Sequence, residues 1–302
     1  TVPDDAYDDN PAATSTETVD VTKIVASAKC EDMKFWSPDS PNLYDVYTVL
    51  KDSEGNVLDV QKTTTGFRKV EYDINDGGLK INDQPVWLTG YAQRSTNEWA
   101  VIGVANDWLQ DLDMQWIKES NSNFIRWMHV APKPSQIRSG DKYGVVSACP
   151  AGDKEADVDG RAWDQRVEAM RDAMIYFRNS PSVIFWETGN NAVTAAHQQE
   201  MTDLKNTLDP NGERFCGCRT ISSTDQIQAA DYVGTMLNRH ASNAKASMAA
   251  IKKYVPIMET EYAREEAPRR VWDDFSPPDY DYRNKSVSYT HLRAHETDQY
   301  LV

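Results

Sequence analysis

Cysteine is scarce in this sequence, and the few cysteines present lack the spacing that metal sites and redox motifs require. The 302 residues contain Cys30, Cys149, Cys216 and Cys218, and no CxxC pair. One residue separates Cys216 from Cys218, which does not suit a tetrahedral zinc site, and no histidine stands nearby at a fitting spacing. We therefore expect four thiols and no metal site.

Long apolar runs and an excess of positive charge are also missing. No apolar run approaches the roughly 18 residues of a membrane-spanning helix, so we expect no membrane span. The sequence has 32 Lys and Arg against 47 Asp and Glu, a net charge of −15. This balance argues against nucleic acid or anionic lipid as a partner.

A methionine start and a signal-peptide pattern are absent, and the sequence begins at Thr1. We expect the true N-terminus to be missing, so this absence does not exclude export. At the other end, residues 287–302 read as the translation of a transposon adaptor used to prepare sequencing libraries. We expect this tail to be non-native, and His291 and His295 therefore enter no argument about metals or catalysis.

The first 66 residues divide into two parts. Residues 1–19 are acidic and rich in Pro, Thr and Ala, which is typical of a linker or loop. In residues 20–66, short β-branched and aromatic runs alternate with Ser-Pro and Glu-Gly-Asn turns. This pattern predicts a small β-sandwich, or part of one.

From residue 67 to 286 the pattern changes to strands that alternate with helices. Such alternation indicates parallel βαβ units, and seven strands fit an eight-stranded TIM barrel without its last unit. The competing fold is an open doubly wound sheet, but no GxGxxG follows the first strand. The predicted strands are 86–93, 124–130, 145–149, 183–189, 215–221, 232–236 and 255–262. The predicted helices are 107–119, 134–142, 161–179, 195–208 and 243–254.

In a TIM barrel the catalytic groups lie at the C-terminal ends of the strands. This rule selects the segments after the first strand (94–99), the second (Arg126 and His129), the fourth (187–191) and the seventh (Glu259 and Glu261). Carboxylates therefore end the fourth and seventh strands. Sugar hydrolysis requires two carboxyl groups, one to attack the anomeric carbon and one to protonate the leaving oxygen.

Several motifs in order resemble glycoside hydrolase family 2. They are WSPDSPNLYDVYTVLKD, the Gly-Phe-Arg at residues 66–68, LKINDQPVWLTGYAQ, NFIRWMHVAP, NSPSVIFWETGN and PIMETEYARE. The resemblance covers residues 21–276, and it implies an immunoglobulin-like β-sandwich, partial here, that leads into a TIM barrel. It also implies a retaining exo-acting hydrolase of β-glycosidic bonds. The family's N-terminal jelly-roll domain and last barrel strand have no counterpart here, so we expect a fragment.

The resemblance assigns roles to the residues at three strand ends. Glu261 matches the nucleophile, whereas we expect Glu259, about 7 Å deeper in a regular strand, to be buried and paired. Arg126 is expected to hydrogen-bond the nucleophile and hold it ionised. His129 is expected to bind a substrate hydroxyl, although a core histidine satisfied by the backbone is nearly as well supported.

Further residues are candidates for sugar binding. Asn190 matches the asparagine that contacts the sugar 2-hydroxyl. Asn97 and Glu98 follow the first strand and are expected to line the pocket, although Glu98 also fits a solvated loop acid. Trp186 is a candidate for stacking on a pyranose ring, whereas Trp127 is expected to belong to the core.

One position departs from the family pattern. The fourth strand of the family ends Gly-Asn-Glu, with the glutamate as acid/base, but here Asn191 takes the glutamate's place. Glu187 is the alternative acid. In a regular strand it would lie about 13 Å nearer the barrel floor than Asn191, whereas retaining chemistry places its two carboxyls about 5–5.5 Å apart. We expect Glu187 to pair with Arg126 or Arg219 instead, unless a bulge brings it closer.

Three hypotheses remain at this point. In the first, the chain is a retaining hydrolase with an unorthodox acid, which could be Glu187 or a loop residue such as Glu98 or Asp153. In the second, it is a carbohydrate-binding protein on a catalytically impaired scaffold. The third is a scaffolding barrel without a sugar site, which would not need the polar residues just named. The mechanism demands no cofactor, and the partner is a carbohydrate substrate whose sugar the sequence does not specify. The resemblance implies a periplasmic or secreted location, and the oligomeric state stays open.

Overall fold

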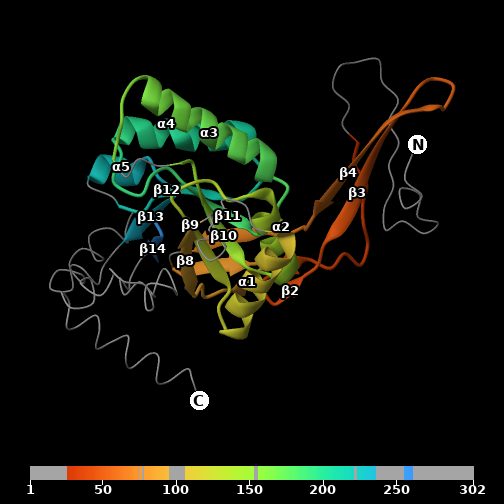
Figure 1. Ribbon diagram of the computed structural model, residues 1–302, viewed down its shortest axis with the longest axis horizontal. Helices are drawn as coiled ribbons and strands as arrows, with labels where there is room; N and C mark the ends of the chain where they lie inside the picture. Colours follow the sequence, from red (N-terminus) through yellow and green to blue (C-terminus); the bar gives the residue numbers. More distant parts are fainter. Residues whose placement is uncertain are drawn as a thin grey trace, which may run out of the picture. The chain divides into compact units, whose positions relative to one another are not determined.

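A seven-stranded parallel sheet is the largest sheet in the described part of the chain (Figure 1). The computed structural model describes residues 26–73, 75–76, 78–94, 106–152, 156–220, 223–235 and 255–260. The strands follow one another in the sheet in the order of the sequence. They are β8 (Gly90–Arg94), β9 (Phe124–Met128), β10 (Val146–Pro150), β11 (Val183–Glu187), β12 (Phe215–Cys218), β13 (Tyr232–Thr235) and β14 (Ile257–Glu259).

Helices cover one face of this sheet and form the larger core with it. They are α1 (Asp107–Glu119), α2 (Pro134–Tyr143), α3 (Arg161–Phe177) and α4 (Ala195–Leu208), followed by the short α5 (Thr224–Gln228). Met114, Met170 and Met201 from three of these helices pack against Trp127 and Trp186 of the sheet. Within the described ranges, no helix is both long enough and apolar enough to span a bilayer.

The strand order confirms the predicted TIM-barrel class. In a doubly wound sheet the strand order reverses at a switch point, whereas here each strand pairs only with its neighbours in sequence. The described residues contain seven strands of the barrel, close to the predicted positions. Helix α5 was not predicted, and the helix predicted for residues 243–254 lies outside the described residues.

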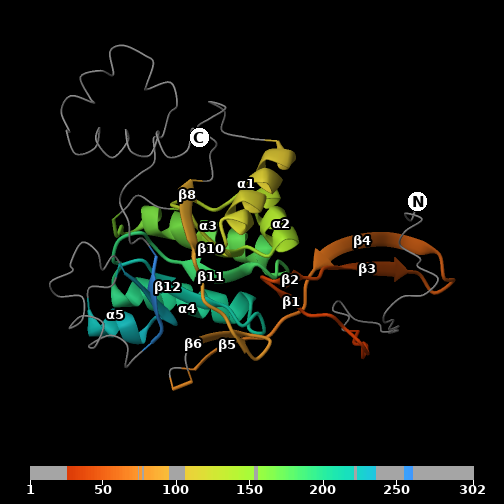
Figure 2. The same ribbon diagram turned by 90° about the horizontal axis from the view of Figure 1, so that it is seen from below.

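Smaller antiparallel sheets precede the barrel. Strands β3 (Tyr44–Lys51) and β4 (Val57–Thr65) form a long hairpin, and β1 (Trp36–Ser37) pairs with β2 (Ser40–Pro41) (Figure 2). These sheets are consistent with a partial β-sandwich. A three-stranded sheet follows, made of β5 (Val70–Asp73), β6 (Gly78–Ile81) and β7 (Gln84–Pro85).

A second apolar cluster closes the N-terminal end of the barrel. Trp36, Val70 and Ile81, from the segments before the barrel, pack with Phe124 of β9 and Phe185 of β11. Side chains two residues apart on a strand point to the same face. Arg126 and Glu187, two residues beyond Phe124 and Phe185, therefore point into the barrel above this apolar floor.

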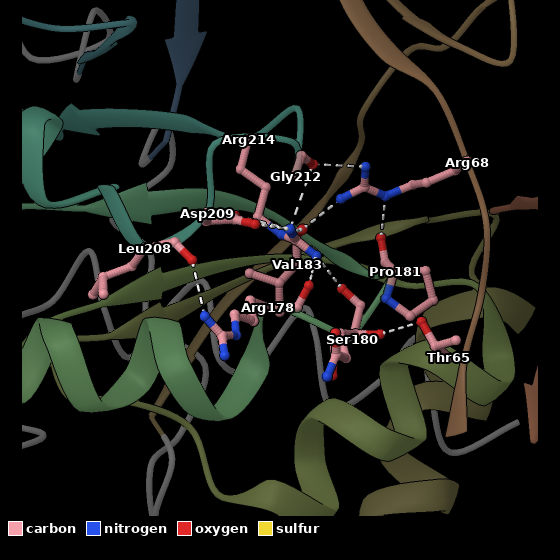
Figure 3. A network of polar contacts seen from close by, with 11 residues as sticks. Thr65, Arg68, Arg178, Ser180, Pro181, Val183, Leu208, Asp209, Gly212 and Arg214 are labelled. Atoms are coloured by element: carbon pink, nitrogen blue, oxygen red, sulfur yellow. Dashed lines mark hydrogen bonds and ion pairs between the residues drawn. The ribbon is translucent and has the colours of Figure 1, made fainter. Parts of the chain in front are cut away.

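Arg68, in the linker between hairpin and barrel, and Arg214, just before β12, both bind carbonyls at the start of β11 (Figure 3). Arg68 donates to the carbonyls of Pro181 at 2.6 Å and Val183 at 2.9 Å, and Arg214 donates to the same Val183 carbonyl at 2.7 Å. A Cβ on Gly66 would lie 2.8 Å from the Pro181 ring. In the Gly-Phe-Arg motif, Gly66 therefore lets the backbone pass close to Pro181, and the Arg68 guanidinium supplies hydrogen bonds to barrel carbonyl groups.

A buried carboxyl on α2 gives the fold a pH dependence. Asp141 is 6% exposed, and its Oδ1 accepts from the Ser182 backbone N–H at 2.9 Å. Burial raises the pKa of Asp141 to about 6. An unfolded Asp has a pKa of about 3.9. The folded state therefore binds the proton more tightly, and the free energy of unfolding falls as the pH rises from about 4 to about 6.

We expect Asp141→Asn to raise the free energy of unfolding at pH 7.5 by on the order of 2–3 kcal/mol. The amide oxygen keeps the bond from Ser182 while the buried charge is removed. Near pH 4 the difference should vanish, because the wild-type carboxyl is then protonated. Urea unfolding at both pH values measures this, with the exposed Asp39→Asn as control. Equal stability of Asp141→Asn and wild type at pH 7.5 would contradict it.

Candidate active site

A fully buried ion pair lies at the centre of the candidate active site. Arg126 of β9 donates from Nε to Glu187 Oε2 at 2.7 Å and from Nη2 to Glu187 Oε1 at 2.5 Å. Both side chains are 0% exposed. Of the two partners that the sequence left open for Glu187, the structure selects Arg126. The bidentate geometry fixes the guanidinium plane.

Asn190 joins this pair to a second arginine. Its Oδ1 accepts from Arg126 Nη2 and from Arg219 Nε, each at 2.9 Å. Arg219 follows the last residue of β12, and Asn190 lies in the turn after β11. Both guanidinium groups are nearly buried, because Arg126 is 0% and Arg219 is 9% exposed. Two cationic donors on one oxygen hold this amide in a single orientation.

His129 lies at the edge of the same cluster. Its Nδ1 is 3.5 Å from Arg126 Nη2, and the residue is 9% exposed. The structure therefore places His129 beside the arginine that the resemblance pairs it with.

Asn191, at the acid/base position, is exposed, and its Oδ1 accepts from Arg219 Nη2 at 3.3 Å. Strand β11 ends at Glu187, two residues before the predicted end. The depth estimated for a regular strand through Asn191 therefore does not apply. Glu187 nevertheless stays fully buried, with both carboxylate oxygens bound to Arg126. As held here, Glu187 presents no acidic proton to a substrate.

The candidate aromatic residue lies in the core. Trp186 is 0% exposed and packs with Trp127 and helix side chains in the helix-facing core. Because neighbouring strand residues point to opposite faces, Trp186 points toward the helices while Glu187 points into the barrel. In this position the Trp186 ring offers no face to a sugar. Trp127 belongs to the core, as predicted.

Other predicted site residues fall outside the described residues. Glu261, Asn97, Glu98 and Asp153 all lie there, so their roles stay predictions. Glu261 follows Thr260, a buried residue directly after β14. The four cysteines are present as thiols, as predicted.

The floor beneath the ion pair is aromatic. Tyr232 of β13 is 1% exposed and packs edge-on against Phe185 at 5.3 Å between ring centroids. A Cβ on Gly217 would lie 2.6 Å from this tyrosine ring, so glycine leaves room for it. Burial, together with the charge of Glu187, raises the pKa of Tyr232 well above its usual value. The hydroxyl is therefore neutral at physiological pH.

Breaking the Arg126–Glu187 ion pair is expected to lower the free energy of unfolding strongly. Glu187→Gln removes the carboxylate that both Arg126 nitrogens bind, and removing one partner of a buried pair costs about 3–5 kcal/mol. We expect that loss in urea unfolding. The double variant Arg126→Met, Glu187→Leu should recover much of it, because no buried charge of the pair remains. A loss below about 1 kcal/mol in Glu187→Gln would show that other groups balance Arg126.

Comparison with known proteins identifies the family. The model for "Glycosyl hydrolases family 2" matches residues 2–68, and the model for "Glycosyl hydrolases family 2, TIM barrel domain" matches residues 72–269. The chain belongs to glycosyl hydrolase family 2. The family 2 barrel model alone covers more than half of the chain, and it contains every candidate site residue named above. The resemblance inferred from the motifs is confirmed.

Two curated relatives are named for activity on different sugars. A β-glucuronidase of Formosa agariphila is 35% identical over 269 residues, which cover 88% of this chain and 26% of that protein. A β-galactosidase of Photobacterium profundum is 28% identical over 188 residues, 58% of this chain and 18% of that protein. The chain thus spans about a fifth to a quarter of the length of these curated relatives.

Solved structures agree with the family assignment. A family 2 β-glucuronidase structure is 32% identical with a TM-score of 0.72, over 88% of this chain and 27% of that one. A family 2 member from Bacteroides cellulosilyticus DSM 14838 shares the fold at 24% identity, with a TM-score of 0.65 over 77% of this chain and 32% of that one.

Proposed function

We propose that this chain is part of a retaining glycoside hydrolase that removes a terminal sugar from a β-linked carbohydrate. The observation that carries the proposal is the polar cluster of Arg126, Glu187, Asn190 and Arg219 at the C-terminal ends of three barrel strands. Buried polar groups of this kind are costly unless they are paired and used. A scaffolding barrel would not need them.

Each residue has a role in this proposal. Glu261 attacks the anomeric carbon and forms a glycosyl-enzyme ester, which water then hydrolyses with retention. Asn190 and His129 bind sugar hydroxyls, and Arg126 orients Asn190. Glu187 positions Arg126 and does not donate the proton. Asn191 faces the leaving oxygen and only donates a hydrogen bond to it, because an amide cannot transfer a proton.

The sugar is proposed from the relatives. The Formosa β-glucuronidase matches more of the chain at higher identity than the Photobacterium β-galactosidase does. We therefore propose a β-glucuronide as substrate, with a β-galactoside as the second candidate.

The proposal is tested on residues 1–286 joined to the flanking regions of the Formosa β-glucuronidase, called the extended protein below. Dinitrophenyl β-glycosides of glucuronic acid, galactose, glucose and mannose need no proton donor, so they report on the nucleophile alone. We expect cleavage of the glucuronide, and proton NMR should show the β-anomer as first product. Cleavage with inversion, or binding of sugars without any cleavage, would contradict the proposal, and the second result would favour a carbohydrate-binding protein.

A further inference from the structure

The three residues at the end of β12 contact every residue of the turn that carries the candidate acid/base position. This turn consists of Gly189, Asn190 and Asn191. Cys218 Sγ lies 3.1 Å from the carbonyl oxygen of Gly189 and 2.9 Å from that of Asn191, and its single S–H is shared between them. The Arg219 backbone N–H also donates to the Gly189 carbonyl, at 3.1 Å.

Side chains complete this set of contacts. Arg219 Nε donates to Asn190 Oδ1 at 2.9 Å, and Arg219 Nη2 is 3.3 Å from Asn191 Oδ1. Thr220 Oγ1 donates to the Asn190 carbonyl at 3.3 Å. One guanidinium therefore binds the side-chain oxygens of two consecutive asparagines. Neither sequence motif nor family resemblance assigned a role in catalysis to Arg219.

The chemistry of arginine fixes how these two amides are oriented. A guanidinium carries only donors, so the amide atom that faces it must be the oxygen. For Asn190 the requirement is double, because Arg126 Nη2 donates to the same oxygen. Rotating either amide by 180° would place an NH₂ group against a cationic donor. Both asparagines therefore direct their NH₂ groups away from Arg219.

We propose that Arg219 is the positioning residue of the site, which fixes Asn190 and Asn191 so that both present N–H donors to the substrate. This inference rests on the proposed function. Asn190 then donates to an acceptor oxygen such as the sugar 2-hydroxyl, and Asn191 donates to the leaving oxygen without transferring its proton. Arg219 acts only through these amides, and it does not touch the reacting atoms.

The test uses Arg219→Met in the extended protein. We expect kcat/KM for the dinitrophenyl glycoside to fall about 100-fold, the usual cost of one lost oriented donor. For the matching 2-deoxy glycoside the fall should be under about 5-fold, because Asn190 has no 2-hydroxyl to bind. The kcat/KM of Arg219→Lys should lie between those of wild type and Arg219→Met. A lysine ammonium lacks the planar pair of donors with which a guanidinium binds both amide oxygens. Equal losses on both substrates would overturn the proposal.

The control is Arg214→Met, which removes a buried arginine directly before β12, at the opposite end of this strand from Arg219. Arg214 holds main-chain carbonyls and Asp209, so this variant should lose stability and affect both substrates alike. A crystal structure of Arg219→Met gives a test that is independent of turnover. The inference predicts that the Asn190 and Asn191 side chains leave their positions, and unchanged amides would overturn it even if the proposed hydrolase activity failed.

Discussion

Replacing Glu261 with Gln is expected to lower kcat for a dinitrophenyl glycoside at least about 10⁴-fold, because an amide cannot form the glycosyl ester. The residue follows β14 directly after Thr260, at the strand end where a barrel presents its catalytic groups. Steady-state kinetics of the extended protein measures the effect. Glu119→Gln, the same change at an exposed position on α1, should leave kcat within about 2-fold.

A second measurement separates loss of the nucleophile from loss of the fold. Glu261→Gly leaves a space in which azide, a small anion, can attack the anomeric carbon in place of the carboxylate. We expect azide to restore release of dinitrophenolate and to give a glycosyl azide of inverted configuration. If Glu261→Gln keeps more than a tenth of wild-type kcat, Glu261 is not the nucleophile.

Restoring the family's glutamate at Asn191 is expected to produce the other large effect. General acid catalysis contributes about 10²- to 10⁴-fold, so Asn191→Glu should raise hydrolysis of unactivated glycosides by that factor. Dinitrophenyl glycosides should change little, because their leaving group needs no proton. The gain should shrink as the pH rises through the pKa of the new carboxyl, since only its protonated form donates.

Asn191→Gln is the matched control, because it lengthens the side chain without adding a proton donor. It should give no gain on unactivated glycosides. A failure of Asn191→Glu to accelerate these substrates would mean that another group already supplies the proton in the wild type. That result would favour the hypothesis that an unorthodox acid, such as Glu98 or Asp153, donates the proton.

Much of the barrel could be predicted from the sequence because its elements have clear local boundaries. The bounds of α1 and α4 agree with those predicted. Thr194 caps α4 through its side chain, which accepts from the His197 backbone N–H at 3.2 Å. Asn121, at a φ of 59°, follows the end of α1. Strand ends were less accurate, because pairing with neighbouring strands, rather than local propensity, determines where a strand stops.

The site was predictable only in part. The rule for barrel strand ends selected Arg126, Glu187 and Asn190, and these side chains do meet. The choice between Arg126 and Arg219 as partner of Glu187 depends on packing across three strands, which one sequence does not reveal. The contacts of Arg219 depend on the turn after Glu187, where the predicted strand had continued. Trp186 shows the same limit, since one position along a strand decides between pocket and core.

The most direct test of this account compares two substrates of one sugar on the wild-type extended protein. Release from the dinitrophenyl β-glucuronide is measured beside hydrolysis of a natural β-linked oligosaccharide that ends in glucuronic acid. With Asn191 at the acid/base position and Glu187 bound to Arg126, the account predicts rapid cleavage of the activated substrate and a kcat/KM at least about 10²-fold lower for the oligosaccharide. Comparable rates on both substrates would contradict it, because a proton donor would then be present in the site.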